Sequence, residues 1–298
     1  MKRRGIKLAI LGLSLTIGLG ALAGCSKGTD EAANPDKKAL SGSITLSGSS
    51  ALLPLIEAAA ETFQDENPDA IINAQAGGSG QGLTQVSEGS VDVGNSDVFA
   101  EEKLDAAKAK ELVDHKVVAQ GFAVVVNKNL NVTNLTKQQI QDIFSGKVKN
   151  WKEVNGPDKE IIIVHRPSSS GTRATFIKTI LDGKKELEND QIGVTQESNG
   201  AVVKAMENSD GSISYVGLAY LNSDEAKSKL AAVKIDNTEA TVENITTGKY
   251  PFWAWGHMYT KGEPNEISKA FIDYITSDAN KAVVEKQGYI SGAEMKVK

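Results

Sequence analysis

The stretch AIINAQAGGSGQGLTQVSE, residues 70–88, contains the pattern that organises this sequence. Residues 70–76 have the composition of a strand, and residues 83–88 that of a helix. Between them lies the loop Gly77-Gly78-Ser79-Gly80-Gln81-Gly82. A glycine-rich loop at the start of a helix presents backbone N–H groups and a hydroxyl to a small anion, with the positive end of the helix dipole behind them.

A second loop of the same kind reads Arg166-Pro167-Ser168-Ser169-Ser170-Gly171-Thr172 and precedes a predicted helix over residues 172–181. It adds an arginine, the side chain best shaped to fork onto an oxyanion. The first loop lacks the spacing of a dinucleotide-binding fingerprint, and no Gly-Lys-Ser/Thr follows it as in a P-loop. The two loops together indicate a protein that encloses an inorganic oxyanion.

Strands and helices are expected to alternate on both sides of these loops. The other predicted strands are 43–46, 91–94, 161–164 and 212–217. The other predicted helices are 52–66, 101–112, 136–144, 201–207, 267–276 and 280–286. Such alternation favours a parallel sheet covered by helices, and therefore an α/β fold.

Two extended runs, near residues 118–127 and 250–260, are expected to cross between two lobes. The predicted lobe I comprises residues 42–120 and 259–298, and lobe II comprises residues 121–258. Ligands of such sheets lie beyond the carboxyl ends of the strands. The ligand is therefore expected in the cleft between the lobes.

The first 25 residues are typical of a secretory signal. A basic start precedes the apolar residues 8–22, and Leu22-Ala23-Gly24-Cys25 resembles the lipobox of bacterial lipoproteins. That ending implies cleavage before Cys25 and a lipid on its new N-terminus. The alternative is a plain signal peptide or a retained anchor with an incidental cysteine. Residues 26–41 are polar and are expected to form a flexible tether.

Charge and cysteine content limit the possible functions. The net charge of the 298 residues is −5, which excludes a basic nucleic-acid footprint. The signal carries four basic and no acidic residues, so its removal would take the charge to −9. An anion binder with this charge must rely on local donors. Cys25 is the only cysteine, so no intramolecular disulfide can form.

Four motifs follow one another along the chain: Ser49-Ser50, the glycine-rich loop, Val91-Asp92-Val93-Gly94-Asn95-Ser96-Asp97, and His165 with the arginine loop. Over about residues 43–290 this order resembles the substrate-binding protein of the bacterial phosphate-specific ABC transporter. The resemblance implies a two-lobed periplasmic-binding-protein fold of type II. It also implies a monomeric, lipid-anchored receptor on the extracytoplasmic face of the cell membrane. That receptor passes inorganic phosphate to permease and ATPase subunits, with no catalysis, cofactor, metal or nucleic acid.

The resemblance implies that Ser79, Asp97, Arg166, Ser170, Gly171 and Thr172 bind phosphate, and to these we add Ser50, Ala51 and Leu52 of the first loop. The hydroxyls and nearby N–H groups would donate, and Arg166 would supply the charge. Asp97 would accept the proton that phosphate still carries at neutral pH, whereas ionised sulfate has no proton to offer it. The first loop departs from the Ala-Thr-Phe form common in proteobacterial members. We expect the Ser50 hydroxyl to bind there, with the N–H groups of Ala51 and Leu52 nearby.

Simpler roles exist for the same residues. The glycine-rich loop could be only a strand–helix turn, Asp97 a helix N-cap, and Arg166 part of a salt bridge between lobes. His165 is expected to be structural rather than a ligand. Other functions are a receptor for sulfate or molybdate, a phosphate sensor or adhesin, or a hydrolase with Ser170 as nucleophile and His165 as base. The three histidines show no metal-ligand spacing.

Overall fold

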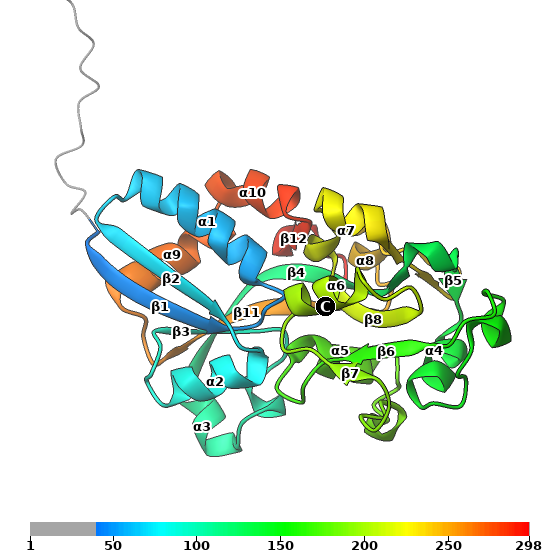
Figure 1. Cartoon of the computed structure of the whole chain (residues 1–298). Coiled ribbons are helices and arrows are strands. Elements are labelled where there is room, and N and C mark those ends of the chain that lie inside the picture. Colours follow the sequence, from blue (N-terminus) through cyan, green and yellow to red (C-terminus); the bar gives the residue numbers. More distant parts are fainter. Residues whose placement is uncertain (1–39, 298) are drawn as a thin grey trace, which may run out of the picture. The chain divides into compact units, whose positions relative to one another are not determined.

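The computed structural model describes residues 40–297, where strands and helices alternate along the chain (Figure 1). The strands are β1 (Gly42–Gly48), β2 (Ala70–Ala76), β3 (Val93–Ser96), β4 (Leu112–Asn127), β5 (Asn134–Leu135), β6 (Ile162–His165), β7 (Val194–Thr195), β8 (Ser212–Gly217), β9 (Leu230–Ala232), β10 (Lys234–Ile235), β11 (Trp253–Lys261) and β12 (Tyr289–Ser291). The α-helices are α1 (Leu53–Glu66), α2 (Ser79–Ser87), α3 (Ala106–Lys110), α4 (Lys137–Phe144), α5 (Gly171–Thr179), α6 (Asn199–Met206), α7 (Asp224–Lys229), α8 (Val242–Thr246), α9 (Glu266–Thr276) and α10 (Lys281–Lys286).

The predicted signal peptide and the lipid site at Cys25 lie outside the described residues, as does most of the predicted tether. Between residues 40 and 297, no helix is both long enough and apolar enough to cross a bilayer.

One part of the main sheet is built around β1. Strands β2 and β3 flank it and both run parallel to it. Strand β11 then pairs antiparallel with β3. Figure 1 shows α1 and α9 beside these strands, with α2 near their carboxyl ends. The strand–loop–helix order in this region brings the loops after β1, β2 and β3 to one edge of the sheet.

The long strand β4 continues the sheet into a second part. Its first half pairs with β11, and its second half pairs with β8, both antiparallel. Strand β6 runs parallel to β8, and β7 runs parallel to β6. The short strands β9 and β12 also pair with β4. The sheet is therefore mixed rather than wholly parallel as predicted, because β4 and β11 return against their neighbours.

The helix predicted over residues 101–112 is wrong. The chain instead forms a 3₁₀ turn at Ala100–Glu102 and then the short helix α3. The Asp105 carboxylate starts α3 by accepting the N–H groups of Ala107 and Lys108 at 3.1 and 3.0 Å. Leu112 then enters β4 opposite Lys261. Pairing with a distant strand thus ends a helix that local composition would continue.

Two large apolar cores lie along this sheet. One joins β1 to α1 and α9, where the Phe63 ring meets Phe271 edge-on at 5.3 Å and Tyr274 at 5.4 Å. The other joins β4 to β8 and α5, and there the rings of Phe176 and Tyr215 stack at 4.2 Å. The apolar run of β4 contributes side chains to both cores. This strand therefore holds the two parts of the sheet together.

We expect Phe63→Ala to lower the free energy of unfolding by about 3–5 kcal/mol, because the ring is 3% exposed and its removal leaves a cavity. Urea denaturation followed by circular dichroism measures this change. Phe99→Ala is the matched control, since that ring is 46% exposed and should lose less than half as much. Equal losses in the two variants would contradict this account of the core.

Candidate functional site

The predicted site residues come from three loops, which follow β1, β3 and β6, and from the first residues of α2 and α5. Ser50, Ser79, Asp97, Arg166 and Thr172 are all at least 96% buried. Hydrogen bonds join these loops to one another although they lie far apart in the sequence. The structure therefore brings together side chains that were predicted separately.

Asp97 follows β3 and lies at the centre of this group. Its Oδ1 accepts hydrogen bonds from the Ser49 hydroxyl and from Gln120 Nε2, the latter at 2.8 Å. Its Oδ2 has a single donor, the Thr172 hydroxyl at 3.3 Å. Burial raises the pKa of the Asp97 carboxyl, while the hydrogen bonds from Ser49 and Gln120 and the charge of Arg166 oppose that rise. Oδ2 is the oxygen with capacity for a further donor.

Ser79 begins α2, and its hydroxyl oxygen accepts the backbone N–H of Asp97 at 3.0 Å. The hydroxyl proton of Ser79 therefore remains available for another acceptor. Gly171, the first residue of α5, lies directly against this pair. A Cβ atom at Gly171 would lie 2.0 Å from Ser79 Oγ and 2.8 Å from Asp97 Oδ2. Only glycine allows α5 to approach this closely.

The arginine loop ends in a capped helix. Ser170 is the N-cap of α5, and its hydroxyl oxygen accepts the N–H of Arg173 at 3.1 Å. The backbone N–H groups of Gly171 and Thr172 belong to the first turn, where no intrahelical acceptor exists. The start of α5 thus offers two N–H groups and the positive end of its dipole beside Asp97 and Ser79.

Arg166 is fully buried, and its guanidinium binds neutral oxygens only. Nε donates to the carbonyl of Gln196 at 3.1 Å, and Nη2 donates to the carbonyl of Glu197 and to the Ser50 hydroxyl, both at 3.2 Å. Nη1 is buried and has no partner among residues 40–297. Burial lowers the pKa of Arg166, and the nearby Asp97 opposes this. The described residues supply no carboxylate that forms a salt bridge with it, so its charge can meet a ligand.

In the loop after β1, Ser49 holds the loop backbone and Ser50 contacts the neighbouring segments. The Ser49 hydroxyl oxygen accepts the N–H groups of Ala51 and Leu52 at 3.1 and 3.3 Å. These two N–H groups, which we expected to face an anion, are therefore paired within the loop. The Ser50 hydroxyl instead accepts donors from Arg166 and from Asn199, whose Nδ2 lies 2.9 Å away.

Two tyrosine hydroxyls hold the backbone of the same loop. Tyr220 donates to the carbonyl oxygen of Ser50 at 2.6 Å, and Tyr289 donates to the carbonyl oxygen of Ala51. Burial raises the pKa of both phenols, which keeps them protonated as donors. Both carbonyl oxygens thus have protein partners.

Sequence reasoning missed three members of this hydrogen-bond network: Ser49, Gln120 and Asn199. Ser49 was noted only as part of the first loop. Gln120 is a polar residue inside the apolar run 117–127, and a buried polar side chain needs a partner. Asn199 follows Ser198, which caps α6 by accepting the N–H of Ala201 at 3.1 Å. Polar residues in an apolar strand and at a helix start were the available signals.

His165 directly precedes Arg166 in the sequence, but its side chain has different partners. Its Nδ1 is 3.2 Å from Glu188 Oε1, and its Nε2 is 2.8 Å from the carbonyl oxygen of Ile192. Both ring nitrogens are thus occupied, and Ser170 is occupied as a helix cap. The structure does not place these two side chains as a nucleophile and its base.

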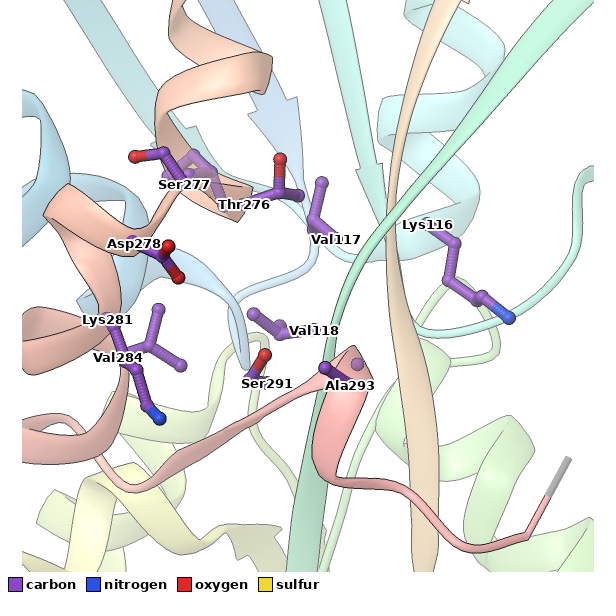
Figure 2. Close-up of a pocket in the computed structure, with 12 residues that line it drawn as sticks. Lys116, Val117, Val118, Thr276, Ser277, Asp278, Lys281, Val284, Ser291 and Ala293 are labelled. Atoms are coloured by element: carbon purple, nitrogen blue, oxygen red, sulfur yellow. The ribbon is translucent and has the colours of Figure 1, made fainter.

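Two cavities of interest border the described chain. A cavity of about 420 Å³ opens beside Asp97 and is lined by Phe99, Trp253, Trp255 and His257. A smaller one of about 240 Å³ lies between β4 and the end of α9 (Figure 2). Figure 2 shows Asp278 and Ser291 beside it, and none of the predicted site residues lines it. Within residues 40–297, no cluster of three or more histidine, cysteine or acidic side chains could hold a metal ion.

Comparison with known proteins gives a consistent picture. The family model for the PBP superfamily domain matches residues 33–279. The phosphate-binding protein PstS of Bacillus subtilis strain 168 is 49% identical over 272 residues, which cover 91% of this chain and 87% of that protein. PstS of Staphylococcus epidermidis ATCC 12228 is 31% identical and covers 92% of this chain and 86% of its own length.

Solved structures agree with this result. One from Clostridium perfringens, described as a phosphate ABC transporter substrate-binding protein with bound phosphate, has a TM-score of 0.76 and 31% identity over 84% of this chain and 99% of its own. An ABC-type phosphate transport receptor from Vibrio cholerae has a TM-score of 0.64 and 25% identity, with 83% and 99% coverage. The predicted fold class, the two-lobed type II periplasmic-binding-protein fold, is confirmed. The chain belongs to the PBP superfamily and, within it, to the PstS family of phosphate-binding proteins.

Proposed function

We propose that this protein is an extracytoplasmic receptor that binds inorganic phosphate and delivers it to an ABC permease for import. The observation that carries the proposal is that two complementary groups occur in one site. Among the described residues, the buried Nη1 of Arg166 has no partner, and Asp97 Oδ2 can accept a second hydrogen bond. A buried charge without a partner is unfavourable by several kcal/mol, so Arg166 favours an anion in the cleft. Asp97 favours an anion that carries a proton.

The remaining groups suit phosphate in number and kind. The proposed ligands are Ser50, Ala51, Leu52, Ser79, Asp97, Arg166, Ser170, Gly171 and Thr172. Helices α2 and α5 both begin at the cleft, and the positive ends of their dipoles favour an anion there. The N–H groups of Ala51 and Leu52 donate to Ser49 in this structure, so they would have to be shared between Ser49 and the anion.

We also propose that phosphate is enclosed by closure of two lobes, 42–120 with 259–298 and 121–258, about crossings near 118–127 and 250–260. Two contacts between the proposed lobes support this. Gly80 N–H donates to the Ser169 carbonyl at 2.9 Å, and Lys103 Nζ donates to the Ser168 carbonyl at 2.8 Å. Hinge closure of this kind excludes water from the ligand and strengthens its hydrogen bonds.

The finer parts of the proposal come from the sequence. Cys25 would carry the lipid that holds a monomeric receptor on the outer face of the cell membrane, and the permease and ATPase subunits would be its partners. The pairing of His165 with Glu188 and Ile192 supports a receptor over a hydrolase. A phosphomonoester assay separates these two classes, because a receptor gives no turnover.

Calorimetry on residues 26–298, stripped of bound phosphate, tests the function directly. We expect phosphate to bind and sulfate to give no heat at the same concentrations. Asp97→Asn should lower the phosphate-to-sulfate ratio of affinities by about 10²-fold or more, because the amide no longer repels an unprotonated anion. Asp273→Asn, a change in the exposed pair with Lys269, is the control and should keep the ratio. Silence of the wild type toward phosphate would overturn the proposed function.

The pH dependence of binding tests the role of Asp97 separately. Burial raises the pKa of this carboxyl, so it gains a proton at a higher pH than an exposed aspartate would. A protonated carboxyl is a weaker acceptor for the phosphate proton than the carboxylate, because the hydrogen bond is no longer charge-assisted, and affinity should therefore fall as the pH drops through that raised pKa. Asp97→Asn should lack this loss, and the difference between the two titrations removes the contribution of phosphate ionisation. Parallel titrations would contradict the assignment.

Gly171→Ala tests the close approach of α5. The added methyl group would lie within 2.0 Å of Ser79 Oγ and 2.8 Å of Asp97 Oδ2, so the donors must separate. We expect phosphate affinity to fall by about 10²-fold or more, since a small misplacement of donors is enough to lose their hydrogen bonds. Gly292→Ala is the control, because its nearest neighbour is the Trp255 ring at 3.7 Å. Unchanged affinity in Gly171→Ala would show that α5 does not border the ligand.

A further inference from the structure

We propose that Asn199 is a positioning residue for phosphate, which sets the direction of the Ser50 hydroxyl proton so that it donates to the anion. The inference rests on the proposed function and extends it to a residue outside the predicted site. Asn199 is the first residue of α6 and is fully buried.

The orientation of the Asn199 amide follows from one contact. Its Oδ1 accepts the backbone N–H of Gly217 at 2.9 Å. A backbone N–H can only donate, so the oxygen of the amide must face Gly217 and Nδ2 must face the cleft. The two ends of the side chain cannot be exchanged without leaving Gly217 unpaired.

Nδ2 then acts on two hydroxyls at once. It donates to Ser50 Oγ at 2.9 Å and lies 3.3 Å from Thr172 Oγ1. Ser50 Oγ also receives the backbone N–H of Asn199 at 3.1 Å and Arg166 Nη2 at 3.2 Å. Three donors thus approach a hydroxyl that has two lone pairs and one proton, so Ser50 has no acceptor capacity left for another group. Its own proton must point away from these donors.

Thr172 contacts the same amide, but its proton has a protein partner. Its Oγ1 accepts from Asn199 Nδ2 and donates to Asp97 Oδ2. The single proton of Thr172 is therefore held by Asp97, and the proton of Ser50 is the one that can point toward the anion. This polarity matters because a hydroxyl that turned its lone pairs toward the anion would repel it. Asn199 disfavours the orientation in which the lone pairs of the Ser50 hydroxyl face the anion. A donor that is already oriented binds an anion more tightly.

The contact also depends on the closed arrangement of the chain. Ser50 belongs to the loop before α1, whereas Asn199 begins α6, and the two lie 149 positions apart. The Ser50 hydroxyl thus acquires its fixed direction only when these two segments meet. The approach of the two segments therefore also orients the Ser50 hydroxyl.

Asn199→Asp is the first variant to measure, because the carboxylate keeps an oxygen for Gly217 N–H and loses only the donor. The Ser50 hydroxyl would turn its proton to this new acceptor, and phosphate affinity should fall by about 100-fold or more. Asn199→Ala removes the donor without adding charge and should lose about 10-fold. Asn280→Ala is the matched control, since Asn280 is equally buried but bonds the Ile275 carbonyl, away from the cleft.

A double-variant cycle separates positioning from a merely structural role. We expect Asn199→Ala to lose far less phosphate affinity in the Ser50→Ala background than in the wild type, because its target hydroxyl is already gone. Asn280→Ala should lower the melting temperature in both backgrounds and leave the phosphate Kd unchanged.

Calorimetric Kd values and ligand-free melting curves supply both readouts. Losses of Asn199→Ala and Ser50→Ala that simply multiply, or an unchanged Kd in Asn199→Asp, would overturn the inference while the proposed function stands. A wild type that does not bind phosphate would overturn the proposed function, and this inference with it.

Discussion

The structure depends above all on a positive charge, that of Arg166, which is held in the interior with no salt bridge to a carboxylate among residues 40–297. Carbonyl oxygens of Gln196 and Glu197 and the Ser50 hydroxyl satisfy part of its guanidinium, and Nη1 is left over. Burial of an unpaired ion is unfavourable, and folding elsewhere must compensate for it. The neighbouring Arg173 shows the contrast, since it forms a two-pronged salt bridge with Asp190 at 2.8 Å for each contact. The chain thus neutralises one buried arginine and leaves the other for a ligand.

The local arrangement explains how a protein of net charge −5 can attract an anion. The starts of α2, α5 and α6 meet at the same cleft, and each contributes N–H groups and the positive end of a dipole. These partial charges act over the few ångströms of a buried site, where the dielectric constant is low. The acidic surface contributes little at that range. In the site that we propose, selectivity would come from Asp97, the one acidic residue among the predicted ligands.

The sequence predicted the loops better than their connections. The strand–loop–helix units around Ser79 and Arg166 have local signals, namely glycine, serine and a change of periodicity, and they appear in the structure. The contacts of Ser49, Gln120 and Asn199 join segments far apart in the chain, and no local pattern encodes such pairing. The helix predicted over residues 101–112 failed for the same reason, because Leu112 pairs with a strand that begins at Trp253. The sequence therefore predicted the loops and their functional groups, but not the hydrogen bonds between segments that lie far apart in the chain.

The groups that hold the backbone of the first loop have a consequence for how this binding site can change. Tyr220 and Tyr289 bind the carbonyl oxygens of Ser50 and Ala51, and the Ser49 hydroxyl binds the N–H groups of Ala51 and Leu52, so these backbone contacts do not use the side chain at position 50. The loop backbone therefore keeps its hydrogen bonds whatever side chain stands at position 50. Replacement of the Ser50 hydroxyl by another group would change the group offered to a ligand without changing these backbone contacts. A family built on such a loop can explore new anions by single substitutions.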